Sequence, residues 1–169
     1  MIMRKRHLSI LLVLLLLVER CPTTFADGNS DFVLEDNGTH LVRYKGKGGH
    51  VIIPDGVICI GYEAFTKCAS MTSVEIPETV TIISDFAFNN CTGLTSITIP
   101  DSVSTIGLWA FAGCTGLTSI TIPASVTKIA GNAFEGCTNL SSAVFEDGAT
   151  VVSGFCNCPA LRNVSVPNS

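Results

Sequence analysis

The chain has 169 residues, enough for one domain of ordinary size. It carries 10 basic and 14 acidic residues, a formal net charge of −4. Binding to nucleic acid or to anionic lipid depends on clustered Lys and Arg side chains. The sparse, slightly acidic charge therefore argues against both kinds of partner.

The first 26 residues have the pattern of a secretory signal peptide. Residues 4–6 are basic, residues 8–18 are apolar except for one serine, and Thr24 and Ala26 are small residues before a cleavage site. The apolar run is shorter than the roughly 20 residues that span a bilayer. We expect cleavage after Ala26 to leave a secreted, extracellular or surface-located chain with no membrane span. Its net charge becomes −7, because four basic residues and one acidic residue are lost.

Residues 27–50 are expected to form an N-terminal cap. Two apolar segments, 32–35 and 40–44, flank Asp36-Asn37-Gly38, and a turn of this kind between apolar segments predicts a β-hairpin. The glycine-rich segment 45–49 then leads into the rest of the chain. It lacks the spacing of a phosphate-binding loop, so we interpret it as a flexible link.

A repeat of 23 residues organises the chain from residue 51 onward. Three columns share this period: an isoleucine before proline, an Ala-Phe pair, and a cysteine. Their members are Ile53, Ile76, Ile99 and Ile122; Phe65, Phe88, Phe111 and Phe134; and Cys68, Cys91, Cys114 and Cys137. A last copy shortened to 21 residues supplies Phe155, Cys158 and Val166.

Each column of the repeat has a physical role. Ile97 and Ile99 alternate with hydroxyl residues, which is typical of a half-buried strand. Pro100 ends that strand because it has no N–H to donate. We expect Val103 and Ile106 to point inward on a tighter segment, and the following Ala-Phe pair to lie on a short helical or 3₁₀ turn.

These features predict a mainly β solenoid over residues 51–169, with about five turns of 21–23 residues. One turn cannot bury its apolar columns alone, but a stacked neighbour covers them. The expected shape is a curved stack with a parallel sheet on its concave face, preceded by the hairpin cap. The last turn has no visible capping segment, and an uncovered strand edge favours pairing with another chain.

The unit from Leu117 to Cys137 resembles the BspA-type leucine-rich repeat, and residues 44–54 resemble the entry module of such arrays. The resemblance covers residues 31–167. It implies a curved solenoid on a secreted or surface protein, found in bacteria and some parasitic protists. It also implies a role in adhesion to matrix proteins or cells, and it carries no catalytic residues.

Seven cysteines remain once Cys21 is removed with the signal peptide. Five occupy one repeat position, and we interpret them as a structural ladder of inward-facing thiols that pack like small apolar groups: Cys68, Cys91, Cys114, Cys137 and Cys158. The alternative is a metal or redox ladder. Cys59 and Cys156 lie off this column, and Cys156 with Cys158 lacks the second pair that a metal site requires.

Hydroxyl side chains fill the outward positions of the predicted strands and form our candidate ligand-binding surface. Its members are Thr72, Ser73, Glu75, Thr95, Ser96, Thr98, Thr118, Ser119, Thr121 and Ser141. Extended solenoid faces bind polypeptides or glycans. The alternative is that Ser and Thr merely suit exposed strand positions and repeat by duplication.

No catalytic, metal or cofactor site is expected. His40 and His50 lie in the cap region, and a hydrolytic arrangement requires partners from separate turns, so we interpret both as surface residues. The leading hypothesis is a protein-interaction module that binds an extracellular protein or glycan in an adhesion-like role, and not an enzyme. The alternative is a structural, self-assembling solenoid, or a remnant of a longer adhesin, that associates through its C-terminal turn.

Overall fold

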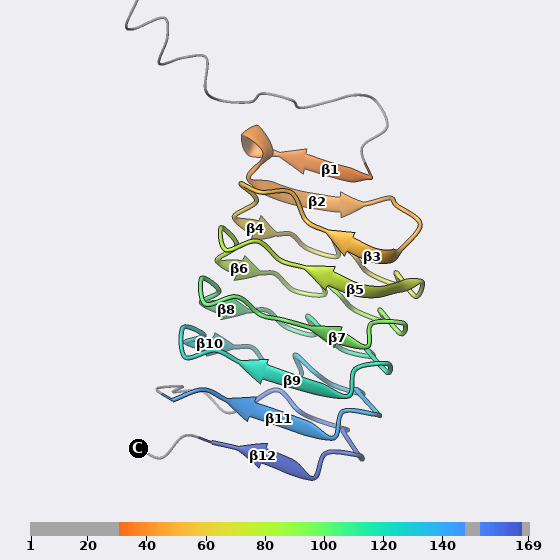
Figure 1. Cartoon of the computed structure of the whole chain (residues 1–169), viewed down its shortest axis with the longest axis vertical. Helices are drawn as coiled ribbons and strands as arrows, with labels where there is room; N and C mark the ends of the chain where they lie inside the picture. Colours follow the sequence, from red (N-terminus) through yellow and green to blue (C-terminus); the bar gives the residue numbers. More distant parts are fainter. Residues whose placement is uncertain (1–30, 148–152, 167–169) are drawn as a thin grey trace, which may run out of the picture. The chain divides into compact units, whose positions relative to one another are not determined.

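The computed structural model describes residues 31–147 and 153–166, which form a stack of short strands (Figure 1). Residues 1–26, the predicted signal peptide, lie outside the described part. Among the described residues no helix is long and apolar enough to cross a membrane. The elements are β1 (Phe32–Glu35), the 3₁₀ turn η1 (Asp36–Gly38), β2 (His40–Tyr44), β3 (Gly49–Ile52), β4 (Cys59–Ile60), β5 (Met71–Glu75), β6 (Ile82–Ile83), β7 (Ser96–Ile97), β8 (Thr105–Ile106), β9 (Ser119–Ile122), β10 (Lys128–Ile129), β11 (Ser142–Phe145) and β12 (Asn163–Ser165).

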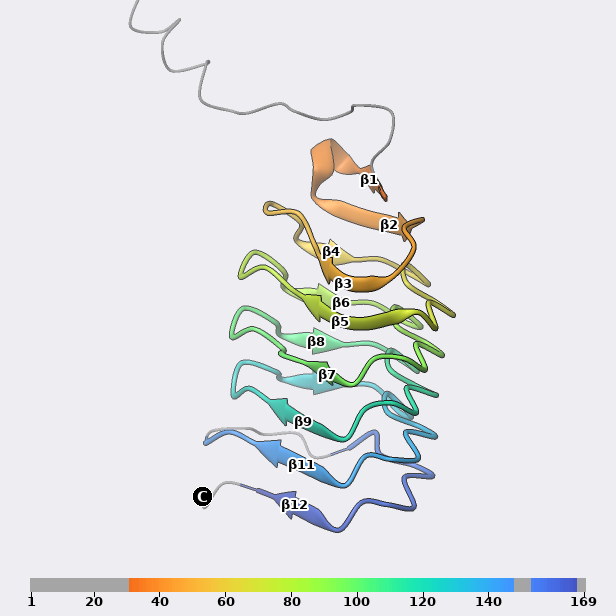
Figure 2. The same ribbon diagram turned by 45° about the vertical axis from the view of Figure 1, so that its right-hand side comes forward.

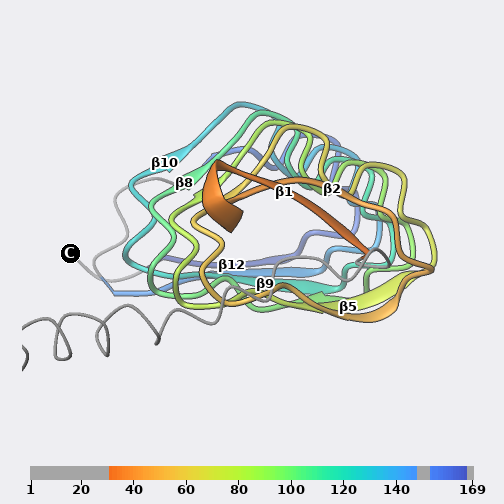
Figure 3. The same ribbon diagram turned by 90° about the horizontal axis from the view of Figure 1, so that it is seen from above.

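The strands stack in two groups, one on each of two opposite sides of the turns (Figures 2 and 3). One side carries the sheets β3-β5-β7 and β9-β11-β12, in which β7 and β9 are neighbours in contact. The other side carries a six-stranded sheet in the order β1-β2-β4-β6-β8-β10. This arrangement confirms the predicted solenoid. The second parallel sheet was not anticipated, because its strands are mostly two residues long and too short to show an alternating pattern.

The predicted hairpin is present at the start of the second sheet. β1 and β2 pair antiparallel, and η1 connects them with Asn37 in the left-handed region at φ 57°. β2 then pairs in parallel with β4, which places His40 beside Cys59 and Leu41 beside Ile60. The hairpin therefore joins the solenoid by continuing one of its sheets.

A continuous row of aromatic rings fills the interior. The four repeat phenylalanines and Phe155 stack with ring centroids 4.8 to 5.2 Å apart and planes within 7° of parallel. Tyr44 extends the row into the cap, with its ring 5.2 Å from Phe65 and 5.2 Å from Phe32. We call this row the aromatic spine: Phe32, Tyr44, Phe65, Phe88, Phe111, Phe134 and Phe155. Because each turn adds one ring, every turn covers an apolar surface left open by its neighbour.

The Ala-Phe segments form consecutive turns with the i→i+3 bonds of the expected 3₁₀ turn, but these turns do not continue into a helix. In the first copy three successive turns close through backbone bonds from Ala64 to Gly61, Thr66 to Glu63 and Cys68 to Phe65. Glu63 and Lys67 have φ of 56° and 60°, and a left-handed residue interrupts a right-handed helix. The freed amide groups bond between turns instead, as when the Phe65 N–H donates to the Ala87 carbonyl at 2.7 Å.

The segment between the hairpin and β3 is held by the first repeat. The Ser70 hydroxyl donates to the Lys47 carbonyl at 2.7 Å, and the Gly49 N–H donates to the Ser70 carbonyl at 2.8 Å. Gly48 has φ +86°, and a Cβ there would lie 2.6 Å from the Ser70 carbonyl carbon. The glycines predicted as a flexible link thus permit close contact with the next turn.

Candidate functional site

The ten predicted ligand-binding residues lie on one surface, which we call the hydroxyl face. They come from β5, β7 and β9 and from the segments that flank β7, β9 and β11, and all are exposed except Ser73, which is half-buried. Parallel register places like residues side by side: Ser73 beside Ser96, and Ser119 beside Ser142. The face therefore extends within each sheet from turn to turn, and β7 lies in contact with β9 where the two sheets meet.

Part of the hydroxyl face bonds to its own backbone. The Thr95 hydroxyl donates to the Thr72 carbonyl at 3.2 Å, and the Ser141 hydroxyl donates to the Thr118 carbonyl at 3.0 Å, each bridging adjacent turns. A hollow of about 390 Å³ lies where the strands end, and Thr98 and Thr121 line it together with Glu78, Asp101 and Glu146. The face thus changes from neutral hydroxyls to carboxylates at this edge.

His50 forms a contact that the sequence reasoning missed. Its Nδ1 lies 2.7 Å from the Ser73 hydroxyl, and its Nε2 lies 3.0 Å from Oε1 of Glu75. These partners come from adjacent turns, because the parallel pairing of β3 with β5 places His50 beside Ser73 and Ile52 beside Glu75. Ser, His and a carboxylate are the groups of an acyl-transfer relay, which also requires an oxyanion hole and exclusion of water. Here His50 and Glu75 are largely exposed. The contact orients the imidazole at one end of the hydroxyl face.

The five repeat cysteines occupy one column, and four of their thiols make a repeated hydrogen bond. Cys91, Cys114, Cys137 and Cys158 each donate to the carbonyl of the phenylalanine 24 to 26 residues earlier, at 3.1 to 3.2 Å. Burial raises the pKa of Cys91 and of Cys137 to about 12 and that of Cys114 well above its ordinary value. A buried thiol with so high a pKa stays protonated and serves as a donor.

The two cysteines outside this column have different surroundings. The Cys59 Sγ lies 3.4 Å from the Ser84 hydroxyl, and Cys156 is exposed. All seven cysteines of the described residues are free thiols. In the part of the chain that the structure describes, no group of three or more His, Cys, Asp or Glu residues is placed to hold a metal ion.

Three aromatic residues outside the core contact one another along a second surface. We call them the aromatic strip: Tyr62, Phe86 and Trp109. Tyr62 lies 5.7 Å from Phe86, and Phe86 lies 5.1 Å from Trp109, between ring centroids. The Trp109 indole N–H donates to Oε2 of Glu135 at 2.8 Å. The sequence signal for this strip is an aromatic residue one or two positions before three of the four Ala-Phe pairs; Asn132 precedes the fourth.

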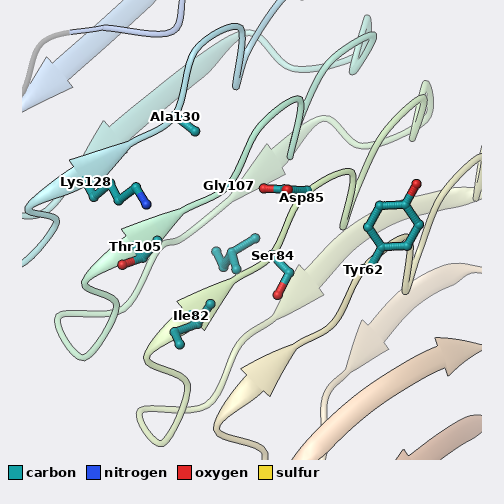
Figure 4. A pocket seen from close by; sticks show the side chains of 9 residues that line it. Tyr62, Ile82, Ser84, Asp85, Thr105, Gly107, Lys128 and Ala130 are labelled. Atoms are coloured by element: carbon teal, nitrogen blue, oxygen red, sulfur yellow. The ribbon is translucent and has the colours of Figure 1, made fainter.

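The strip borders a hollow of about 260 Å³ on the second sheet (Figure 4). Ser84, Gly107 and Ala130 come from one column of small residues, and a Cβ on Gly107 would lie 2.5 Å from the Asp85 backbone nitrogen. Ile82, Thr105 and Lys128, one from each of β6, β8 and β10, line one side, and Tyr62 and Asp85 line the other. The hollow crosses four turns.

With this geometry established, comparison with known proteins assigns the family. A model of the BspA type leucine rich repeat region matches residues 58–169 in six copies. The chain belongs to the BspA-type leucine-rich repeat family. None of the curated proteins compared matches it.

Solved structures of leucine-rich repeat proteins share the fold. A leucine rich cell surface protein of Faecalibacterium prausnitzii is 35% identical, with a TM-score of 0.74 over 82% of this chain and 38% of its own. A leucine-rich repeat protein of Bacteroides ovatus is 34% identical, with a TM-score of 0.64 over 85% of this chain and 39% of its own. The T. pallidum leucine-rich repeat protein is 26% identical, with a TM-score of 0.59 over 80% of this chain and 79% of its own. The chain therefore spans less than two fifths of the first two proteins.

BspA-type repeats and this fold are in general protein-interaction modules and not enzymes. An interaction module acts through exposed side chains that repeat along the stack. The hydroxyl face meets this description on the strands β5, β7 and β9, whereas the aromatic strip lies in the segments that follow β4, β6 and β8 of the other sheet.

Proposed function

We propose that this BspA-type protein is a secreted or surface-associated module that binds an extracellular protein or glycan in an adhesion-like role, using the hydroxyl face. The observation that carries the proposal is the extent of that face, since register places serine beside serine within each of two sheets that meet where β7 contacts β9. The family supports it, as does the F. prausnitzii neighbour, which is a cell surface protein.

The chemistry of the face suits a neutral, polar ligand. Hydroxyl groups donate and accept hydrogen bonds, and they offer both to peptide groups and to sugar hydroxyls. The side chains that bridge turns, such as Thr95 on Thr72, hold the surface rigid before binding, which lowers the entropy lost on association. His50, Glu75 and the carboxylates at the other edge then limit where a charged ligand group is accepted.

The test is a charge placed on the face, with a matched charge placed elsewhere. We expect the triple variant Thr95→Lys, Thr118→Lys, Thr121→Lys to lose at least about tenfold in affinity for a target found with immobilised matrix proteins or a glycan array, because each lysine adds unpaired charge and bulk. The control is Thr81→Lys, Ser104→Lys, Thr127→Lys, a comparable hydroxyl column that flanks the strands of the second sheet. Equal loss in both variants, or loss in neither, contradicts the proposal.

A second function, association through the last turn, rests on a different observation. Val164 and Val166 belong to apolar columns that are buried in earlier turns, yet they are 47% and 49% exposed. A further turn, of the same array or of a second copy, would cover them. Light scattering of residues 27–169 over a hundredfold concentration range tests self-association. A mass that rises with concentration and becomes constant in Val164→Glu supports it, and a constant mass of one chain contradicts it.

A further inference from the structure

The backbone at the aromatic strip does not call for aromatic residues. Phe86 and Trp109 have φ of 58° and 52°, a left-handed conformation that costs a bulky residue free energy and that Asn or Gly adopts more easily. Asn132 occupies the same repeat position one turn later, with φ 61°. Since the fold accepts asparagine here, the turn itself does not explain the two large rings.

Burial in the core does not explain the rings either. The strip lies outside the aromatic spine, and Tyr62 is 61% exposed. Phe86 and Trp109 are only half-buried, and both contact another ring of the strip. Ile82, which lines the adjoining hollow, is 39% exposed. Exposed aromatic and aliphatic side chains beside a hollow are a feature of interaction surfaces.

The charges around the strip are mostly negative. The pKa of Tyr62 is raised first by the negative charge of Glu63, then by burial, by a hydrogen bond with Glu63 and by the negative charge of Asp85. Glu135 accepts the hydrogen bond of the Trp109 indole. Tyr62 and Trp109 thus each interact with a carboxylate. Lys128, on the opposite side of the hollow, is the cation that lines it.

We propose that the aromatic strip and its hollow form a second binding site, distinct from the hydroxyl face, for a short basic segment of an extracellular polypeptide. Arginine or lysine side chains would lie over the Phe86 and Trp109 rings, where cation–π attraction acts, while nearby carboxylates balance their charge. Four turns at about 4.8 Å spacing give a length of about 14 Å, which matches about four residues of extended chain. Acidic groups on this side favour a basic peptide over a neutral glycan.

Trp109 provides a local signal, because it is the one tryptophan of the chain. The probes are an acetylated, amidated peptide that alternates glycine with two arginines, and the same peptide with citrulline, a neutral isostere of arginine. We expect Trp109 fluorescence emission to change with the concentration of the arginine peptide until it saturates, and the affinity to fall at high salt. We expect the citrulline peptide to bind at least about tenfold more weakly.

Four variants make the test specific to the strip. Phe86→Asn keeps the reporter and the backbone conformation and is expected to weaken the arginine peptide by about tenfold. Glu135→Gln keeps an acceptor for the indole and is expected to weaken binding and its salt dependence. Lys128→Ala is expected to tighten binding, since it removes a like charge. Thr118→Lys, on the hydroxyl face, is expected to leave it unchanged.

Circular dichroism and the unfolding midpoint confirm that each variant is folded before binding is measured. Three results overturn the proposal: equal binding of the arginine and citrulline peptides, unchanged binding in Phe86→Asn, or emission changes with a neutral glucose hexasaccharide but not with the arginine peptide. Because Thr118→Lys reports on the other face, failure here leaves the proposed function separately testable.

Discussion

The ring of Tyr44 lies against the ring of Phe65, with centroids 5.2 Å apart and planes tilted by 33°. Tyr44 ends the hairpin and Phe65 begins the repeated stack, so this contact connects the two parts through the core. The Tyr44 hydroxyl also accepts a hydrogen bond from the Gly48 N–H at 3.2 Å. One side chain therefore continues the aromatic spine and holds the segment that leads into β3.

Removing the Tyr44 ring is expected to detach the cap. We predict that Tyr44→Ala lowers the free energy of unfolding by about 2–4 kcal/mol, since a large ring is lost from a partly buried site. Tyr44→Phe loses only the hydroxyl bond and should cost about 1 kcal/mol or less. Urea denaturation measures both. Similar losses in the two variants would show that the hydroxyl, and not the ring, holds the cap.

The middle of the spine is expected to be more sensitive than its end. Phe111 stacks on two rings, Phe88 and Phe134, and is fully buried, whereas Phe155 is half-buried in the last turn. We predict a loss of about 3–5 kcal/mol for Phe111→Ala and a clearly smaller loss for Phe155→Ala. Equal losses in urea denaturation would contradict a stack stabilised by contacts between neighbours.

The repeat columns made the solenoid predictable because each inward position is occupied by the same kind of residue in every copy. The repeat period alone predicts that Ile97, Phe111 and Ile120 are buried. The hydroxyl face followed as the complement of those columns. The repeat period does not show, however, which residues from different repeat positions contact one another. For this reason only the structure shows two contacts: that of His50 with Ser73 and Glu75, and that of Tyr44 with Phe65.

The aromatic strip could not be predicted from the sequence for a different reason. Its backbone conformation recurs in four turns, but the residue at this position changes from Glu63 to Phe86, Trp109 and Asn132. A search for repeated residues discards such a column as variable. The second sheet could not be predicted from the sequence, because most of its strands contain only two residues.

The thiol column predicts a dependence on alkaline pH. Unfolding exposes Cys91 and Cys137, which then ionise near 9, whereas in the folded chain their pKa is about 12. Between these values the unfolded state binds fewer protons, so the stability contributed by the buried thiols is complete below pH 9 and falls as pH rises toward 12. We predict a Tm that decreases between pH 8 and 10.5, and a smaller decrease in the double variant Cys91→Ala, Cys137→Ala.

Thiol labelling provides an independent check on the same column. At pH 8 the exposed Cys156 should react with iodoacetamide within minutes, while Cys91, Cys114 and Cys137 remain unmodified in the folded chain. Mass spectrometry of tryptic peptides identifies the modified sites. Rapid modification of Cys114 would show that the column opens locally, and the pH argument would then lose its basis.

Lys67 is expected to destabilise its own turn. It has φ 60°, and the same repeat position holds Asn90, Gly113, Gly136 and Asn157, the residue types that best tolerate a left-handed backbone. We predict that Lys67→Asn raises the free energy of unfolding by about 0.5–1 kcal/mol, and that the reciprocal change Asn90→Lys lowers it by a similar amount. Urea denaturation of both variants tests the sign. Opposite shifts support a backbone origin, because Lys67 and Asn90 have different side-chain neighbours, whereas shifts in the same direction would assign the effect to side-chain contacts.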